Sequence, residues 1–211
     1  MESFLHAQLL PLYKAYNEHV KPLIADIEWH YEKFPLPIFN EIRAFNDHVA
    51  RCYSEQLDQR IIEKQISKAK SHIERILLDC YKYLNVALYD KTITKFERWT
   101  RYIDIAVIDN GEFYPKYKTM RNNITINLKK AKMLERKNDK NEAILLYESV
   151  YNSYNDLYDL QEEYRLKINW AIAKFTTKKV ITFLGWLGAA IISGIVSSLV
   201  VPWGEIIAIF R

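Results

Sequence analysis

Apolar residues recur at every third or fourth position along most of the chain, which is the period of one buried face of an α-helix. Pro11 and Pro22 punctuate an aromatic, amphipathic N-terminal region, and the proline-rich break at 34–37 begins the next helix. The pattern predicts further helices over 38–57, 61–89, 92–107 and 117–137, with the turn signal Asp109-Asn110-Gly111 after the third. We therefore expect an all-α bundle.

The same periodicity predicts which side chains face the core. In 38–57 they are Ile38, Ile42, Phe45, Val49, Cys52 and Tyr53, and in 61–89 they are Ile66, Ala69, Ile73, Ile76, Leu77, Cys80 and Leu84. The two cysteines of the chain are both in these sets, and we expect them to be reduced and structural, as is usual in the cytosol.

Glycine is scarce before residue 185: the first 184 residues contain Gly111 alone, whereas the chain has five glycines. Sheets need turn residues at frequent intervals, and phosphate-binding loops need glycines that let the backbone approach the ligand. The composition therefore argues against β-rich folds and excludes Walker-type and Rossmann-type nucleotide sites from this part. The histidines and cysteines show no metal-ligand spacing, and we expect no metal and no cofactor.

A heptad-like seam follows the polar break at 138–141 and runs toward the C-terminus. Its members alternate spacings of four and three, and all but the glutamine are apolar or aromatic: Val150, Tyr154, Leu157, Gln161, Tyr164, Ile168, Ala171 and Phe175. Such a seam either packs against the protein's own bundle or joins copies of the same helix. Both interpretations remain open at this stage.

The segment 180–204 contains 25 consecutive uncharged residues. As an α-helix it would be about 37 Å long, enough to cross a hydrocarbon core of ~30 Å. Lys174, Lys178 and Lys179 precede it, whereas one acidic and one basic residue follow it, so the positive-inside rule places the N-terminal part in the cytoplasm. The expected location is a bacterial inner membrane, with the C-terminus outside.

These patterns divide the chain into four parts. We expect a helical domain over 1–140, a long helix or stalk over 141–179, a transmembrane helix over 180–204 and a short extracytoplasmic tail over 205–211. The predicted fold is thus a cytosolic helical bundle whose long C-terminal helix continues into a single transmembrane span.

The most suggestive polar cluster lies at 41–51. On a helix Arg43, Asp47 and Arg51 form an i, i+4, i+8 row, and His48 borders the buried face. The next helix repeats these residue types between 72 and 79. If the two helices pair, guanidinium, carboxylate and imidazole groups meet, and such a group can position a phosphate and move a proton. The same side chains can form a structural ion-pair network, which is the favoured interpretation.

The spacing Arg43-x4-His48 resembles the motif of the HEPN superfamily, compact helical domains of defence systems in which an Arg-x4–6-His motif cuts RNA in a dimer. The resemblance covers about 38–88. It implies that Arg43 and His48 are the catalytic pair of a ribonuclease. That family usually carries its motif late in the domain, whereas here the motif comes early, so we prefer a helical scaffold with lost or altered activity.

A basic stretch extends from 116 to 140, with nine basic residues against two acidic ones, although the net charge of the whole chain is only +4. Helical periodicity turns its apolar residues inward and its basic residues outward. Such a face attracts an oligonucleotide, a signalling nucleotide or an anionic headgroup, and the alternative is an ordinary solvated surface. The candidate ligand-binding residues are Arg121, Lys129, Lys130, Lys132, Arg136 and Lys137.

Small residues follow one side of the predicted span. Gly185, Ala189, Ser193 and Ser197 form an i, i+4 row, and Gly194 belongs to the neighbouring row. Small residues let helix backbones approach closely, and hydroxyl groups hydrogen-bond between membrane helices or line water. These five residues are the candidate pore or oligomer interface of a homo-oligomer.

The architecture resembles the transmembrane effectors of bacterial antiviral defence, including the membrane accessory proteins of RNA-targeting CRISPR systems and channel-forming effectors gated by nucleotide or oligonucleotide signals. This resemblance implies an oligomer that opens a pore and depolarises the inner membrane when a cytosolic ligand or a partner defence protein acts on the helical domain. Two alternatives remain: a membrane-tethered HEPN-type ribonuclease and a passive tail-anchored adaptor.

Overall fold

The computed structural model describes residues 2–54 and 58–200, with side chains described for 3–54 and 58–197. Every regular element in this part of the chain is helical, which confirms the predicted all-α fold. In chain order the elements are α1 (Glu2–Ala15), the π-helical η1 (Tyr16–Val20), α2 (Lys21–Tyr31), α3 (Leu36–Arg51), α4 (Gln59–Tyr89), the π-helical η2 (Asp90–Thr94), α5 (Lys95–Trp99), the 3-10 element η3 (Ile105–Gly111), α6 (Phe113–Arg136), α7 (Lys140–Glu163) and α8 (Arg165–Val200). The predicted tail at 205–211 and the last residues of the predicted span lie outside the described residues.

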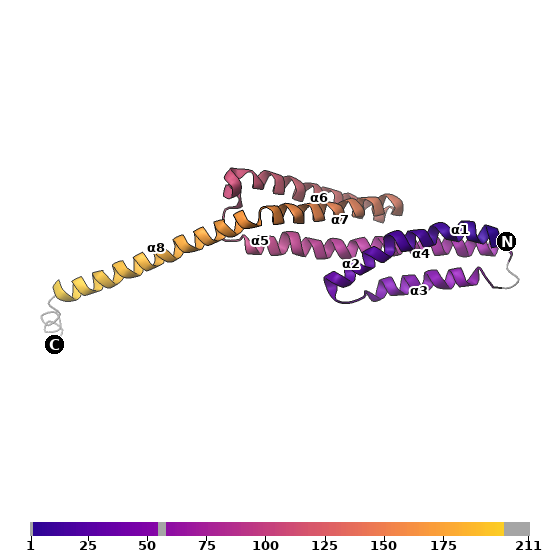
Figure 1. Cartoon of the computed structure of the whole chain (residues 1–211), viewed down its shortest axis with the longest axis horizontal. Helices are drawn as coiled ribbons and strands as arrows, with labels where there is room; N and C mark the ends of the chain where they lie inside the picture. The colour runs from indigo at the N-terminus through magenta and orange to yellow at the C-terminus, as the bar shows by residue number, and fades with distance from the viewer. Residues whose placement is uncertain (1, 55–57, 201–211) are drawn as a thin grey trace.

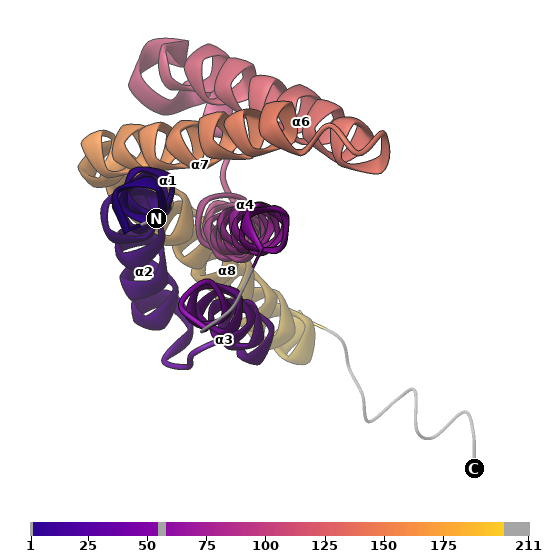
Figure 2. The same cartoon turned by 90° about the vertical axis from the view of Figure 1, so that its right-hand side faces the viewer.

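Helix α4 is the centre of an elongated bundle. The arm α1–η1–α2 and helix α3 pack along one half of α4, and the hairpin of α6 and α7 packs along the other (Figure 1). Viewed along the long axis, α4 lies between α3 on one side and α7 on the other (Figure 2). Helix α8 leaves the bundle at the end opposite the N-terminus and extends away from it (Figure 1).

The bundle has two main hydrophobic clusters, one for each half. The first joins α1, α2, α3 and α4 to the turn end of the α6–α7 hairpin, which contributes Ala131, Ala143 and Tyr147. In this cluster the buried ring of Phe45 packs edge-on against Tyr13 at 5.6 Å between ring centroids. The second joins the end of α4 to α5, α6, α7 and the first turn of α8, where the Phe113 ring lies 5.2 Å from the Tyr164 ring. Leu128 of α6 packs against both clusters, so the two halves form one continuous core.

The residues predicted to face the core in α3 and α4 are buried or half-buried, with one exception. Tyr53 is 64% exposed, because α3 ends at Arg51 and the chain turns at 52–54. The predicted helix over 38–57 is therefore too long, and its last three residues lie outside the described part of the chain. Cys52 and Cys80 are buried free thiols, as predicted.

The structure corrects three expected helix boundaries: the break at Pro11, the start of the helix predicted over 117–137 and the end of the helix predicted over 92–107. Helix α1 passes through Pro11, which is exposed, so that water can solvate the backbone carbonyl that loses its partner. Helix α6 begins at Phe113 and contains Pro115 in its first turn, where a proline N–H would have no helical partner anyway. The helix predicted over 92–107 ends at Trp99, and η3 follows it with backbone angles at Asp109 and Asn110 in the left-handed region.

The one polar member of the predicted seam has a structural reason. Gln161 is buried, and its Nε2 donates to the backbone carbonyl of Thr92, 2.6 Å away in the π-helical turn η2. The Thr92 hydroxyl in turn donates to the carbonyl of Leu88 at 2.7 Å. A buried backbone carbonyl must be hydrogen-bonded, and the amide of Gln161 meets this need across α7 and η2.

The seam itself divides near the start of α8. Its members from Val150 to Ile168 are buried in the bundle's own second cluster, which decides between the two interpretations for that part. The predicted unbroken helix pauses at Tyr164, whose backbone angles (φ −92°, ψ 2°) separate α7 from α8. From Ala171 to Ser197 the side chains of α8 are half-buried or exposed.

Candidate functional site

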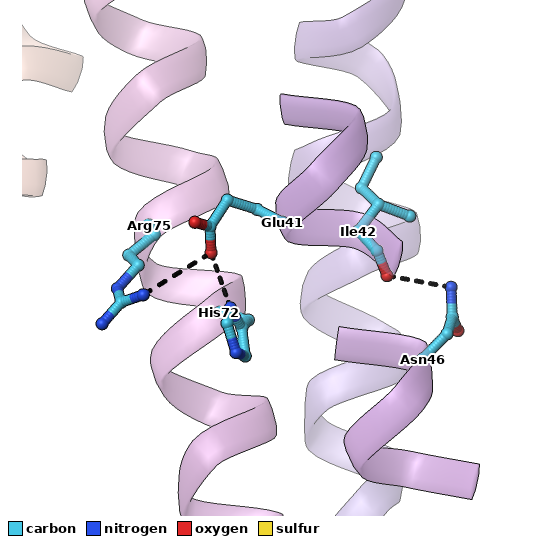
Figure 3. A network of polar contacts seen from close by, with 5 residues as sticks. All are labelled: Glu41, Ile42, Asn46, His72 and Arg75. Atoms are coloured by element: carbon cyan, nitrogen blue, oxygen red, sulfur yellow. Dashed lines mark hydrogen bonds and ion pairs between the residues drawn. The ribbon is translucent and has the colours of Figure 1, made fainter. Parts of the chain in front are cut away.

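The polar cluster predicted between α3 and α4 is present, but a different carboxylate holds it together. Nδ1 of His72 on α4 donates to Oε2 of Glu41 on α3 at 2.6 Å, and Nη1 of Arg75 lies 3.9 Å from the same oxygen (Figure 3). Glu41 is therefore the acceptor that joins the two helices. Asp47 instead pairs with Arg51 within α3, at 3.5 Å and on an exposed surface.

His48 belongs to the same interhelical cluster. Its Nδ1 donates to Oε1 of Gln65 on α4 at 2.7 Å, and its ring stacks on that of His72 with centroids 5.2 Å apart. Glu41 and His48 are seven residues apart, as are Gln65 and His72, so each pair occupies one face of its helix. This spacing is the sequence signal that could have identified Glu41 and Gln65 as partners.

Arg43 and His48 are not brought together within one chain. Five residues correspond to about 500° of helical rotation, which leaves the two side chains roughly 140° apart around α3. The Arg43 side chain is exposed, and within the described residues it makes no hydrogen bond or ion pair. The geometry matches an interhelical network made by His48, with Arg43 outside it.

The basic residues of α6 do not form one uniform face. Arg121 is paired with Glu97 of α5, with Nη1 and Oε1 2.8 Å apart. The residues at the other end of the helix are exposed, and no ion pair with another described residue involves them: Lys129, Lys130, Lys132, Arg136 and Lys137. The structure thus concentrates the available positive charge at the α6–α7 end of the hairpin, far from the point where α8 leaves the bundle (Figure 1).

Lys132 also lies beside a cleft between α4, α6 and α7, with a volume of about 320 Å³. Its lining combines apolar, aromatic and cationic side chains: Lys82, Asn85, Val86, Tyr89, Leu128, Lys132, Tyr147 and Tyr154. Nδ2 of Asn85 donates to the backbone carbonyl of Tyr147 at 3.0 Å, whereas its buried Oδ1 accepts no hydrogen bond from any described residue. The buried side-chain amide of Asn85 is thus hydrogen-bonded through its nitrogen but not through its oxygen.

A network of charged groups fixes one edge of this cleft. Nζ of Lys82 lies 2.8 Å from Oε1 of Glu135, and the Tyr147 hydroxyl donates to Oε2 of Glu135 at 2.9 Å. Burial raises the pKa of Glu135, but the hydrogen bonds from Lys82 and Tyr147 outweigh it and hold the pKa below its ordinary value. Burial lowers the pKa of Lys82, and its contacts with Glu135 and Asp79 outweigh it and raise the pKa. Both shifts describe a stable ion pair.

Burial raises the pKa of two tyrosines that line the cleft, Tyr147 and Tyr154, so both phenols are neutral at physiological pH. Burial raises the pKa of Tyr154 to about 12. Burial likewise raises the pKa of Tyr117 on α6 to about 12, and its hydroxyl has no hydrogen-bond partner among the described residues. The cleft therefore offers phenol and amide groups for hydrogen bonding and a lysine for charge, but no anion apart from the Glu135 carboxylate, which is already paired.

The small residues of α8 are all on an uncovered helix. Gly185, Ala189, Ser193, Gly194 and Ser197 are exposed, and a Cβ atom added at Gly185 or Gly194 would meet no atom within 4 Å. The large apolar side chains around them are exposed too, and none of the residues in the most apolar window of α8 is buried. Helix α8 is long and apolar enough to cross a membrane.

The described residues contain no group of three His, Cys, Asp or Glu side chains that could hold a metal ion. Comparison of the chain with protein-family models, with curated proteins and with solved structures finds no match.

Proposed function

We propose that this protein is an oligomeric membrane effector, in which a ligand bound by the cytosolic bundle controls a pore formed by the α8 helices. The observation that carries the proposal is the exposure of the apolar side chains of α8 from Val180 to Val196. Burial of each large apolar side chain away from water is worth about 1.5–3 kcal/mol, so a helix with this many exposed ones requires an apolar solvent. A lipid bilayer supplies it.

The flanking charge sets the orientation of the proposed span. Lys174, Lys178 and Lys179 are exposed on the bundle side of the apolar stretch. Basic residues favour the cytoplasmic side of a membrane, so the bundle is cytosolic in this proposal. The resemblance to membrane effectors of bacterial antiviral defence supplies the biological setting, with the bacterial inner membrane as the site of action.

The open space next to Gly185 and Gly194 supports association of the α8 helices within the membrane. With no atom within 4 Å of a Cβ at Gly185 or Gly194, the backbone of a second α8 can approach this side closely. Ser193 and Ser197 supply hydroxyl groups that can hydrogen-bond to a neighbouring helix or contact water in a pore. A plain anchor needs neither feature.

The proposed ligand is a nucleotide or an oligonucleotide. The α4–α6–α7 cleft has aromatic walls that suit a base, because Tyr89, Tyr147 and Tyr154 line it. Lys132 lies at the same cleft and continues into the exposed lysines and arginines of the α6 end, which suit phosphates. Because this end lies far from α8, we prefer a soluble polyphosphate to a headgroup of the spanned membrane.

The proposal is tested by ion flux through the full chain reconstituted in vesicles, with a potential-sensitive dye and with ATP and a short single-stranded oligoribonucleotide as probes. We expect leakage from the wild-type protein in the presence of a probe. Gly194→Leu should reduce leakage and oligomer size, because the larger side chain separates the helices. Ile191→Leu replaces one exposed apolar side chain by another of the same volume, and this variant should behave as the wild type.

The ligand part has a separate control. Lys132→Glu should weaken probe binding and make the remaining binding less dependent on salt, whereas Lys14→Glu on α1 should leave both unchanged. Equal leakage from the wild type and from Gly194→Leu, or none from either with every probe, would contradict the pore. In that case membrane insertion alone would remain, as expected for a tail-anchored adaptor.

A further inference from the structure

A second surface of the bundle reaches the level at which the proposed span enters the membrane. The loop after α5, together with η3, runs alongside the first turns of α8 (Figure 1). Nζ of Lys179 lies 5.7 Å from the centroid of the Tyr102 ring. Because Lys179 immediately precedes the uncharged stretch, Tyr102 lies at the height of the lipid headgroups when α8 is inserted.

This juxtamembrane surface, defined as residues 98–111 and 165–179, is rich in exposed aromatic and aliphatic side chains. Tyr102 is 62% exposed, and Val107 and Trp170 are each 65% exposed. Between the loop and α8 lies a groove of about 830 Å³, lined by Val107, Trp170 and Phe175 together with Lys174 and Lys178. Tyrosine and tryptophan side chains concentrate at membrane interfaces, where the ring is apolar and its polar group meets water.

The net positive charge of the juxtamembrane surface favours anionic lipid headgroups. The residues 98–111 and 165–179 include seven basic residues and two acidic ones. Both acidic residues are already engaged within the protein: Oδ2 of Asp109 lies 2.6 Å from Nζ of Lys167, and Oδ1 of Asp104 accepts a hydrogen bond from the backbone N–H of Ala106 at 2.9 Å. Arg165 is also paired, because its Nη1 lies 2.9 Å from Oε2 of Glu162. The residues that present positive charge to an approaching leaflet are therefore Arg98, Arg101, Lys174, Lys178 and Lys179.

We infer that the juxtamembrane surface binds anionic phospholipid headgroups of the leaflet next to the bundle, as a membrane contact additional to α8. Tyr102 inserts its ring among the headgroups, and Lys174 and Lys178 bind their phosphates. The contact holds the bundle against the bilayer surface and fixes the angle between bundle and span. This inference rests on the proposed insertion of α8, but it requires neither the pore nor the nucleotide ligand.

The test uses the full chain in phosphatidylcholine vesicles, with and without phosphatidylglycerol, and a spin label on a single introduced cysteine. Tyr102→Cys is the test position, Ile191→Cys reports on the span, and Tyr53→Cys is the matched aqueous control, because this tyrosine is as exposed as Tyr102 but follows the far end of α3. The native cysteines Cys52 and Cys80 are buried, so the unmodified chain serves as the labelling blank. Collision with oxygen and with a water-soluble nickel complex measures the depth of each label.

We expect label 191 to be deep, label 53 to be aqueous and label 102 to reside at headgroup depth in vesicles that contain phosphatidylglycerol. Replacing Lys174 or Lys178 by Gln should lower the ratio of docked to undocked bundle about fivefold for each lysine removed. Depth at position 102 should decrease in phosphatidylcholine alone.

Three outcomes would overturn the inference. An aqueous label 102 beside a deep label 191 would show that the span inserts while the bundle stays off the surface. The same depth with and without phosphatidylglycerol would exclude recognition of anionic headgroups. Unchanged depth of label 102 after both Lys174→Gln and Lys178→Gln would exclude phosphate binding by these two lysines. An aqueous label 191, in contrast, would contradict the proposed span itself.

Discussion

Helix α7 and residues 180–197 of α8 are both rich in large apolar side chains, along one face in α7 and on all sides in α8, and they meet different surroundings. Val150, Tyr154 and Leu157 of α7 are completely or almost completely buried between α4 and α6. Phe183, Trp186 and Ile191 of α8 are more than half exposed. The difference is made by the neighbouring helices, because the bundle ends where α8 leaves it (Figure 1).

This comparison shows that an apolar helical seam has no fixed partner. One part of the seam is completed by the same chain, and the continuation of the helix requires another partner, which we propose to be lipid and further copies of α8. The junction lies between Ala171 and Lys179, where half-buried and exposed positions alternate and basic residues appear. Substitutions on the two sides of this junction should therefore have different consequences.

The largest difference is expected between two phenylalanines. Phe45→Ala removes a ring that is 1% exposed and packed on Tyr13 and Tyr16, and it should lower the free energy of unfolding of the bundle by about 3–5 kcal/mol. Phe183→Ala removes a ring from the exposed part of α8 and should leave this free energy unchanged. Denaturant titration of the full chain in detergent, followed by circular dichroism, measures both. Equal losses would mean that α8 packs on the bundle.

The second-largest difference is expected when a lysine is introduced on each side of the junction and membrane insertion is compared. Ile191→Lys should disfavour membrane insertion by about 3 kcal/mol, because a lysine at the centre of a span is costly. Leu145→Lys, on an equally apolar and 64% exposed position of α7, should have no effect on insertion. The carbonate-resistant membrane fraction of each variant reports the result, and an unchanged fraction for Ile191→Lys would contradict the span.

Glu135 gives the bundle a pH dependence that the uncharged part of α8 lacks. Its folded-state pKa is lower than its ordinary value of 4.5, so its stabilising contribution is complete above about pH 4.5 and is lost as the pH falls through the folded pKa. Glu135→Gln should lower stability by about 1–2 kcal/mol at neutral pH and should flatten the acid limb of the stability profile. Glu28→Gln, at an exposed position of α2, is the matched control for the replacement of a glutamate by glutamine.

The smallest difference is expected between two glycines. Gly111 has a φ of +93°, and Gly111→Ala should cost about 1 kcal/mol of bundle stability because side chains disfavour this conformation. Gly185→Ala lies in a helix with no atom within 4 Å of the new Cβ, and should not destabilise the bundle. Thermal unfolding of the two variants in the same detergent gives the comparison. A lower unfolding temperature for Gly185→Ala, with no change for Gly111→Ala, would contradict this prediction.

Helical periodicity predicted most of the fold because it depends on local spacing. It placed the buried faces of α3, α4 and α6 correctly, and it identified the apolar part of α8. It failed at ends and interruptions: the end of α5 at Trp99, the pause at Tyr164 and the passage of α1 through Pro11. These features depend on capping and on solvent access to a few backbone groups, which the spacing of apolar residues does not encode.

The candidate sites were predictable only in part. The sequence identified His48, the α6 lysines and the small residues of α8, but it did not identify Glu41 or Gln65 as the partners across α3 and α4. It also gave no indication of the cleft near Lys132, because its walls come from α4, α6 and α7. A contact between helices requires the rotation and the offset of each helix, and neither is contained in the sequence of one helix.

By itself, the sequence determined that the chain is helical, that its glycine-poor part contains no phosphate-binding loop and that its C-terminal helix is apolar, because composition and local periodicity suffice for these statements. Only the tertiary structure decided that the seam from Val150 to Ile168 is completed by the same chain, that Gln161 binds a π-helical carbonyl and that Tyr102 reaches Lys179. These three facts join residues far apart in sequence. Such pairings are chosen by the packing of the whole bundle, because most buried polar groups need a hydrogen-bond partner and apolar helix faces are stabilised when another element covers them.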